Sequence, residues 1–399
     1  MFKKYKNQDL DVAFWWKKNP KTPSDYVKLI SDQLTKISAA TTSDSRRKAQ
    51  EECTKYLIGL KHFVIGDMDP KPTHESLDEL YLAILGADLF YDLVLHFNEL
   101  EFEARKEVSL IFSICLGYSK DNKPVTVDYL VSQPGTVTLM LRSTELALQQ
   151  KGASQDIFLV LGNMIIECIK YEQLCRIILK DQQLWKFFDF TGLPNFEIST
   201  ESLQVLSNVF TVHPTLVSKE FFCNEHNRTK FIRNINKLMA HGNYVIKRQS
   251  TKLLASLIII RSNNQLMNQY IDSADNLKLI MTVMTDKSKN LQLESFNVFK
   301  VIVANPRKTK PVFDILTKNR TNLLKYLDSF GLDNQDSTFL EEREFIIHQI
   351  DGLPRIVSSS NESNSPIGNG SNHSNISTSP VHDLSNTNAM DHQNSGNLH

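Results

Sequence analysis

The sequence predicts an all-α protein, built as an armadillo- or HEAT-like superhelix of helical repeats. Glycine is scarce, with 14 residues in 399, whereas doubly wound nucleotide-binding folds use glycine in their turns and phosphate loops. Most segments between polar breaks carry apolar residues at the three- and four-residue spacing of an amphipathic helix. Four of these segments also resemble one another at intervals of roughly 45 residues, which is the period of armadillo and HEAT repeats.

Length, charge and cysteine content exclude several other classes of protein. The chain is 41% hydrophobic, enough for a sizeable core, and its 45 basic side chains balance 45 acidic ones. This balance provides no global electrostatic footprint for nucleic acid or for an anionic membrane. The five cysteines are an odd number, and four lie in apolar helical patterns, which indicates reduced thiols in the cytosol or nucleus. We expect neither a secretory signal nor a membrane span, because the apolar runs are too short.

The N-terminal part predicts a lead followed by a capped helix. We expect residues 1–13 to be a flexible lead and residues 14–357 to form the repeat domain. Thr22 can cap the first helix, with Pro23 at the first helical position and Asp25 completing a capping box.

Proline and glycine set the next boundaries. A proline-containing loop at 65–76 should precede two helical stretches, one at 77–97 and one at 103–118. Pro134-Gly135 should divide the following stretch into two helices.

A repeat is clearest after Asp156. The segments "DIFLVLGNMIIECI", "ESLQVLSNVFTVH", "RQSTKLLASLIII" and "LESFNVFKVIVAN" look alike, and the pairs Glu201-Ser202, Gln249-Ser250 and Glu294-Ser295 hold equivalent places. Shorter helices lie between the copies, so each unit offers two or three helices that cannot bury their apolar faces alone. We therefore expect about six stacked repeats in a right-handed superhelix.

The chain changes composition after its last predicted helix, at 337–353. Residues 358–399 are rich in Ser and Asn with few large apolar side chains, which predicts a disordered tail. Ser365-Pro366 and Ser379-Pro380 are candidate sites for proline-directed phosphorylation, although such pairs are common by chance.

Local signatures of catalysis and of metal binding do not occur in the sequence. We find no glycine-rich phosphate loop, H-E-x-x-H, Cys-x-x-Cys pair, EF-hand loop or nucleophile elbow. Cys168 and Cys175 are seven residues apart on apolar helical sequence, which favours core packing over a metal site. We therefore expect no enzyme activity, no cofactor and no metal, although a site assembled from distant residues stays an alternative.

Two sequence features point to binding instead. Trp15 and Trp16 lie beside lysines in "FWWKKNPK" and either cover the apolar edge of the first repeat or contact a membrane or nucleic acid. Lys278 and Met281 share a helix face in "NLKLIMTVMTDKSKN", where a thioether beside a lysine suits a pocket for an apolar side chain next to an acid. A methionine that fills the repeat core explains the second pattern equally well.

The helix "NYVIKRQSTKLLASLIII" at 243–260 has two different faces. Its apolar face is predicted to be buried, and it is formed by Ile246, Leu253, Leu257 and Ile260. The opposite face carries a basic ridge, which we define as Tyr244, Lys247, Arg248 and Lys252. Close cations on one helix repel each other mildly without an anionic partner, and Ile258 and Ile259 should extend this face with apolar surface. The ridge is therefore either a solvated surface or a partner site.

Several segments resemble the calcium-binding protein 39 family of scaffold proteins, called HymA in filamentous fungi. They are "NYVIKRQSTKLL", "NLKLIMTVMTDKSKNLQLESFNVFKVIVANPRKTKPVFDILTKN", "DIFLVLGNMIIECIKYEQLCRIIL", "WKFFDF" and "FWWKKNPKTPSDYVKLI". The resemblance spans roughly 14–353, is strongest in the second half, and points to a yeast member.

The resemblance implies a non-enzymatic scaffold that binds Ste20-related (germinal-centre) kinases or a related pseudokinase and stabilises their active conformation. In fungi it implies work in cell polarity and morphogenesis beside an NDR-type kinase, in the cytoplasm at sites of polarised growth such as the bud neck. It also implies a pocket for a Trp-Glu-Phe-like tail, whose matching positions here are Tyr244, Lys247, Arg248, Lys252, Lys278 and Met281.

A second, concave contact with the kinase is implied at Arg261 and Lys318. Asn264 departs from the aromatic residue that animal members tend to carry, which places this contact in doubt or implies a more polar partner. The alternative function is a generic armadillo-type peptide-binding or transport adaptor. Such receptors line their groove with a Trp and Asn ladder, and three tryptophans are too few for one.

Overall fold

The structure is a computed structural model that describes residues 20, 22–67, 71–149, 155–332 and 334–354. These residues belong to one compact unit, Met1–Arg355. Within the described ranges the chain is helical, and its one β-type contact is an isolated bridge between Lys120 and Lys123. The predicted lead, Trp15, Trp16, the tail and its two Ser-Pro pairs lie outside the described residues.

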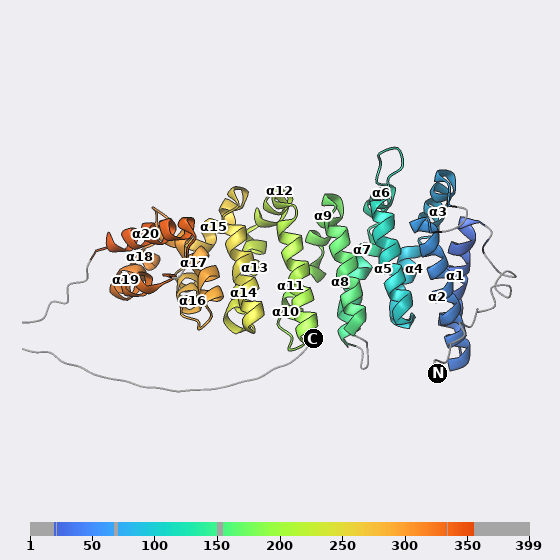
Figure 1. Cartoon of the computed structure of the whole chain (residues 1–399), viewed down its shortest axis with the longest axis horizontal. Helices are drawn as coiled ribbons and strands as arrows, with labels where there is room; N and C mark the ends of the chain where they lie inside the picture. Colours follow the sequence, from blue (N-terminus) through green and yellow to red (C-terminus); the bar gives the residue numbers. More distant parts are fainter. Residues whose placement is uncertain (1–19, 21, 68–70, 150–154, 333, 355–399) are drawn as a thin grey trace, which may run out of the picture. The chain divides into compact units, whose positions relative to one another are not determined.

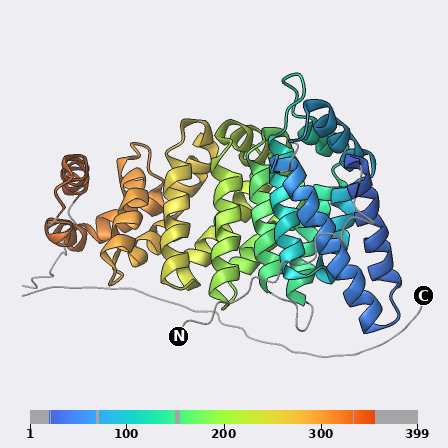
Figure 2. The same cartoon turned by 45° about the vertical axis from the view of Figure 1, so that its right-hand side comes forward.

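The helices form three sets that alternate along the chain (Figures 1 and 2). We name the first set the ladder, and its members pack in chain order, each on the next: α2 (Ser43–Ile65), α5 (Phe102–Gly117), α8 (Gln155–Ile169), α11 (Phe196–Thr211), α14 (Tyr244–Ile258), α17 (Lys289–Ala304) and α20 (Ser337–Asp351). The second set supports the ladder: α1 (Pro23–Ala39), α4 (Leu89–Leu95), α7 (Gly135–Gln149), α10 (Lys186–Thr191), α13 (Glu225–His241), α16 (Ala274–Met284) and α19 (Arg320–Ser329). The third set comprises α3 (His74–Gly86), α6 (Val125–Ser132), α9 (Glu172–Lys180), α12 (Pro214–Leu216), α15 (Asn264–Ile271) and α18 (Lys310–Lys318).

One helix from each set makes a repeat unit. The α1–α2 pair is followed by six such triplets in the described chain, from α3–α4–α5 to α18–α19–α20. The prediction of an all-α, armadillo-like array of about six repeats is therefore confirmed. Because each unit buries its apolar faces mainly against its neighbours, side chains are positioned by the adjoining units of the stack.

The repeat pattern reflects a small buried residue at each rung. Ser202, Ser250 and Ser295 are fully buried at equivalent places in α11, α14 and α17. The hydroxyls of Ser202 and Ser295 donate hydrogen bonds of 2.7 Å to the carbonyl four residues earlier. The buried Ser250 hydroxyl has no hydrogen-bond partner among the described residues. At Ser202 and Ser295 the serine satisfies its own hydroxyl, so these two rungs hold a small buried residue without burying an unpaired group.

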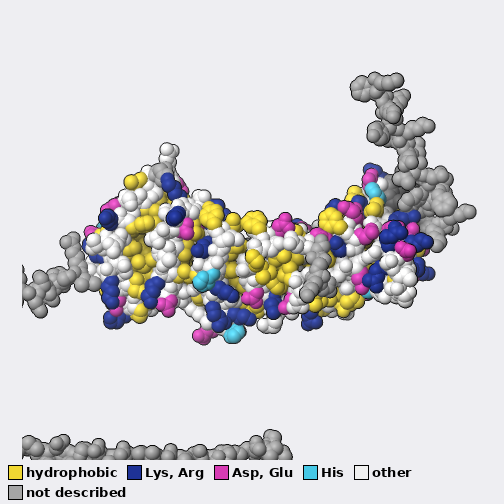
Figure 3. Space-filling view, turned by 90° about the horizontal axis from the view of Figure 1, so that it is seen from below, with side chains coloured by type: hydrophobic (Ala, Val, Ile, Leu, Met, Phe, Trp, Pro, Cys, Tyr) yellow, Lys and Arg dark blue, Asp and Glu magenta, His cyan; other side chains and the backbone are white. Residues whose placement is uncertain are grey.

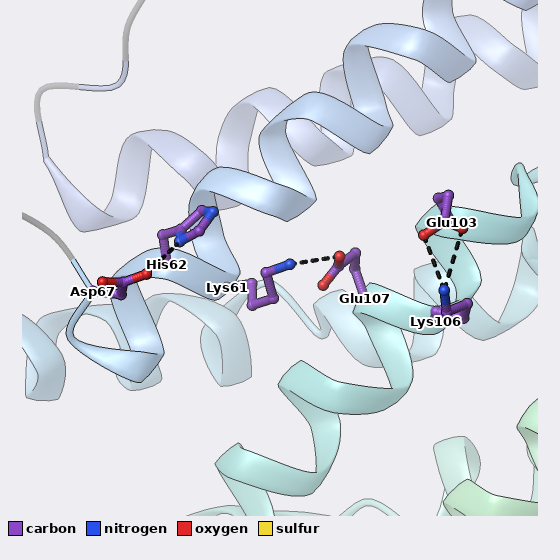
Figure 4. Close-up of polar contacts among 6 residues, drawn as sticks. All are labelled: Lys61, His62, Asp67, Glu103, Lys106 and Glu107. Atoms are coloured by element: carbon purple, nitrogen blue, oxygen red, sulfur yellow. Dashed lines mark hydrogen bonds and ion pairs between the residues drawn. The ribbon is translucent and has the colours of Figure 1, made fainter.

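Ion pairs connect several neighbouring ladder helices. Lys61 on α2 lies 2.6 Å from Glu107 on α5, as Figure 4 shows between the His62–Asp67 and Glu103–Lys106 pairs. Arg105 on α5 pairs with Asp156 on α8 at 2.7 Å. These pairs set the register of one rung against the next, because each joins fixed positions on two helices.

The predicted capping signals are confirmed. The hydroxyl of Thr22 accepts a hydrogen bond from the Asp25 N–H at 3.3 Å, and the Asp25 carboxylate accepts one from the Thr22 N–H at 2.9 Å. Helix α6 ends at Ser132 and α7 begins at Gly135, as Pro134-Gly135 predicts. Four of the five free cysteines are buried, and Cys223 is exposed.

Two local predictions were wrong. The stretch 77–97 forms two helices, because Asp88 between α3 and α4 adopts a left-handed conformation with φ 49°. Ile258 is buried in the core, whereas Ile259 is 66% exposed. Only one of the two isoleucines that we expected to extend the ridge face is therefore on the surface. The ridge face therefore ends in less apolar surface than the sequence suggested.

Candidate functional site

The basic ridge lies on α14 and faces α17 of the next repeat. The Asn243 side chain caps α14 by accepting a hydrogen bond from the Ile246 N–H at 3.0 Å, and Ser288 caps α17. Because α14 and α17 are neighbouring ladder helices, these two caps bring Tyr244 at the first position of α14 next to the start of α17. Figure 3 shows the lower edge of the array in Figure 1, where hydrophobic side chains are exposed between lysines and arginines.

Tyr244 is exposed but already engaged. Hydrogen bonding with the side chains of Ser288 and Asn290, together with the nearby Arg248 cation, lowers the pKa of its hydroxyl below the ordinary value of 10. Its ring is 46% exposed. The hydroxyl is thus held in place while much of the ring is left for contact with a partner.

Arg248 is the most constrained cation of the ridge. Its Nη2 lies 3.7 Å from the carboxylate of Glu294 on α17, and the two side chains are 35% and 15% exposed. Its Nε is buried and has no hydrogen-bond partner among the described residues. The Arg248 side chain also hydrogen-bonds the Tyr244 hydroxyl. A buried N–H without a partner is costly, so Glu294 and Tyr244 orient a guanidinium whose Nε is left unsatisfied.

The remaining ridge cations are less constrained. Lys247 is half-buried and Lys252 is exposed, and neither forms an ion pair with a described side chain. They add positive potential beside Arg248 without a fixed geometry.

Lys278 and Met281 lie on α16, which packs against α17. Lys278 is exposed and pairs with Asp275 on its own helix at 2.9 Å, so no ion pair joins it to the ridge. Met281 is half-buried and lines a small cavity of about 140 Å³ with Leu323 and Tyr326 of α19. Met281 also packs against the hydrophobic core, so its placement fits both alternatives that the sequence left open.

A larger cavity lies beside both the ridge and the Met281 pocket. It has a volume of about 630 Å³ and is lined by residues of α17, α19 and the following loop, including Asn290 and Tyr326. Asn290 also contacts Tyr244, and Tyr326 also lines the Met281 pocket. We name this set of neighbouring features, from Tyr244 through both cavities to Met281, the α14–α19 site.

Tyr326 is a residue that sequence reasoning missed. Its hydroxyl donates a hydrogen bond of 2.7 Å to the Met284 carbonyl, and burial raises its pKa to about 12. It is held as a neutral phenol between the two cavities. Its place depends on how α19 folds back on α16, which the amphipathic pattern of α19 alone does not reveal.

Arg261 lies apart from the α14–α19 site. It is exposed in the 3₁₀ turn Arg261–Asn263, at the opposite end of α14 from Tyr244, and exposed Asn264 opens the next helix. Farther along α15, Met267 and Ile271 line a third cavity of about 680 Å³ together with parts of α17 and α20, including half-exposed Phe345.

Lys318 is not brought next to Arg261 by any described contact. It is the exposed last residue of α18, and its neighbour Asn319 lines the Met281 pocket. The start of α18 touches the end of α15, where the Thr309 hydroxyl donates 2.9 Å to the Asp272 carbonyl. The resemblance implied one concave contact at Arg261 and Lys318. Arg261 precedes α15 and Lys318 ends α18, so the contact between these two helices lies between the two residues.

Two other kinds of site have no counterpart in the described part of the chain. No group of three or more His, Cys, Asp or Glu side chains there is placed to hold a metal ion. None of the helices in that part is both long and apolar enough to cross a membrane.

A stack of three-helix units of this kind places the protein in the class of armadillo-like helical-repeat proteins. The comparisons identify its family. Residues 14–354 match the family model described as Mo25-like. The chain is 71% identical over 391 residues to Protein HYM1 of Saccharomyces cerevisiae, covering 98% of each chain. It is 34% identical over 339 residues to the mouse Calcium-binding protein 39-like, covering 85% of this chain and 97% of that protein.

The chain therefore belongs to the Mo25-like family, whose members are scaffold proteins and not enzymes. The resemblance found in the sequence is confirmed. Among solved structures, a designed armadillo repeat protein aligns with 69% of this chain and 99% of its own length, at 11% identity and a TM-score of 0.39.

Proposed function

We propose that this scaffold binds a Ste20-related (germinal-centre) kinase or a related pseudokinase and shifts it toward its active conformation. The scaffold would act in a cell-polarity and morphogenesis network that includes an NDR-type kinase through indirect association. We place it in the cytoplasm, enriched at sites of polarised growth such as the bud neck. Family membership supports the scaffold role, and the kinase partner follows from the family resemblance.

The α14–α19 site suits a Trp-Glu-Phe-like tail. Its two cavities, with Tyr326 between them, offer separate places for two aromatic side chains. Aromatic side chains dominate interface energetics because each buries a large apolar area. We assign them to these cavities, with Met281 and the Tyr244 ring as apolar walls.

The proposal rests mainly on one observation, which is the position of the Arg248 guanidinium at the edge of the site. A guanidinium has five N–H donors in a rigid fork, and Glu294 engages only Nη2. The Tyr244 hydroxyl engages this side chain as well, and the buried Nε lies out of reach of a ligand. The tail glutamate or a terminal carboxylate would therefore meet the part of the fork that is still exposed, and Lys252 adds attraction. The existing ion pair orients the fork before the ligand arrives, which reduces the ordering cost of binding.

Activation requires more than tail binding, because a ligand shifts an equilibrium only through different affinities for the two states. The tail would act as a tether that raises the effective concentration of the kinase domain at the array. A second contact that fits the active kinase better would supply the differential affinity. We assign this contact to the Arg261 region, with the cavity beyond Asn264 as its apolar part.

The test is a titration with a fluorescent Trp-Glu-Phe peptide. We expect Arg248→Ala to weaken binding by about 2 kcal/mol, or roughly 30-fold in Kd, on the scale of buried interface arginines. Arg261→Ala is the matched control, an exposed arginine at the other end of the same helix, and should leave peptide affinity unchanged while reducing activation of a full-length kinase. Equal peptide affinity for wild type and Arg248→Ala would refute the site.

A further inference from the structure

A groove at the N-terminal end of the array lies outside the α14–α19 site. It has a volume of about 460 Å³ and follows one outward stripe of α2, from Glu51 to His62. Its apolar wall is formed by Ile58, at 37% exposure, and by the Tyr26 ring. Figure 4 shows His62 at one end of this stripe, beside Lys61 and Asp67.

The groove exists because Tyr26 lies directly over a glycine. A Cβ at Gly59 would come within 2.6 Å of the Tyr26 ring, so a side chain there would displace the ring. The α1–α2 pair also begins the array, and no described helix covers it from the N-terminal side. Terminal units of repeat proteins need a cap, since they lack the neighbour that buries an inner unit.

The chain that enters the groove supplies a candidate cap. Pro20, which lies just before the first helix, itself lines the groove, and it follows "FWWKKN" at 14–19. Extended over four to six residues, this segment spans about 13–20 Å, and the α2 stripe is about 16 Å long by helical rise. The Mo25-like match begins at residue 14, the first of the three aromatics.

One carboxylate in the groove favours the same occupant. The groove is lined by two acids, Glu51 and Glu101, and by Lys55 and His62. Glu51 already pairs with Arg47 at 2.9 Å, whereas Glu101 accepts a hydrogen bond from the Thr54 hydroxyl at 3.2 Å without an ion pair to a described cation. Lys17 and Lys18 directly follow the tryptophans. A segment tethered at the rim also has a high effective concentration, which a free peptide must overcome.

We propose that this groove binds the Phe14–Trp16 segment of the same chain and that the segment thereby closes the N-terminal end of the array. At least one of Trp15 and Trp16 packs against Ile58 and Tyr26, and one of the two lysines pairs with the Glu101 carboxylate. The inference is independent of the kinase partner and of the α14–α19 site.

Tryptophan fluorescence tests the proposal in the full-length protein. The chain has three tryptophans, at 15, 16 and 185, so Trp185→Phe leaves only the two of interest. We expect their emission to be blue-shifted, and acrylamide quenching to be several-fold weaker than for a free FWWKKNPK peptide. Adding Ile58→Glu should restore quenching to the peptide level. The matched control is Leu110→Glu, a similarly exposed site on α5 outside the groove, which should change nothing.

Hydrogen exchange provides the reciprocal measurement. Trp15→Ala/Trp16→Ala should speed exchange in α1 and α2 and leave α14 and α17 unchanged, because repeat stability is local. Peptide-like quenching in the Trp185→Phe protein overturns the proposal. Quenching by acrylamide that stays weak after Ile58→Glu also overturns it. That result would mean that the tryptophans are buried elsewhere, for example against a second copy.

Discussion

We expect Arg105→Met to destabilise the packing of α5 against α8. The Arg105 side chain is 8% exposed, and its Nε and Nη2 donate to one oxygen of Asp156 at 3.1 and 2.7 Å. Its Nη1 also donates to the Leu100 carbonyl and approaches the Phe97 carbonyl at 3.5 Å. One side chain thus closes the turn before α5 and joins two rungs.

The expected cost follows from what the substitution leaves behind. Removing one partner of a buried ion pair costs about 3–5 kcal/mol when the other charge stays buried. Asp156 is 18% exposed and regains some water, which favours the lower end, while the carbonyls lose a net contribution of about 1 kcal/mol per hydrogen bond. We therefore expect a local loss of about 3 kcal/mol, on the scale of breaking a partly solvated buried pair.

Hydrogen exchange of α5 and α8 is the appropriate assay, because a repeat array need not unfold in one two-state transition. Arg105→Met should raise exchange of the stable amides in these helices by about 100-fold, the equivalent of about 3 kcal/mol. The control Arg105→Met/Asp156→Leu should recover much of the loss, since it removes the stranded charge. A change below tenfold, or a double variant no better than the single one, would refute the reasoning. Tail-peptide affinity at α14 should be unaffected.

Two further predictions concern buried titratable groups. Burial raises the pKa of Glu201 above its ordinary 4.5, so the folded array holds this proton more tightly than the unfolded chain does and loses stability as pH rises through the folded pKa. Glu201→Gln should therefore unfold at a higher urea concentration than wild type at pH 7. This difference in the urea midpoint should shrink toward pH 4. A constant difference across pH would exclude ionisation of Glu201 as its cause. Cys223 is exposed and the other four cysteines are buried. Burial raises the pKa of the Cys53 and Cys175 thiols to about 12. Ellman's reagent should label one thiol rapidly and none in Cys223→Ser; two fast thiols in wild type would contradict the burial pattern.

The fold was predictable where every repeat carries the same constraint. Ser202, Ser250 and Ser295 are small because each sits where two ladder helices approach closely, and that constraint recurs with the repeat. The break at Asp88 was missed because "LGADLF" contains no proline and continues the apolar pattern on both sides. A left-handed residue between two helices is set by how they pack on α1 and α7, which local sequence does not encode.

The site was predictable only in part, for the same reason. Helical periodicity alone places Tyr244, Arg248 and Lys252 on one face of α14. The Arg248 partner Glu294 comes from the next repeat, and Tyr326 of the neighbouring cavity comes from the repeat after that, so both follow only from the stacking. The buried state of Ile258 has this origin too, since α14 is covered by α11, α13 and α17.

The ion pairs between ladder helices distinguish the cations that stabilise the array, Lys61 and Arg105, from the candidate binding residue Arg248. Lys61–Glu107 and Arg105–Asp156 are closer than 3 Å, and Arg105 directs three nitrogens at acceptors. Such groups have few donors left for a partner. Arg248 occupies a comparable place between α14 and α17, yet its pair with Glu294 is 3.7 Å long and its buried Nε has no described acceptor. Incomplete satisfaction of a partly buried cation costs stability unless another group completes it. At the α14–α17 rung an acidic partner would therefore add to an ion pair that is longer than the other two.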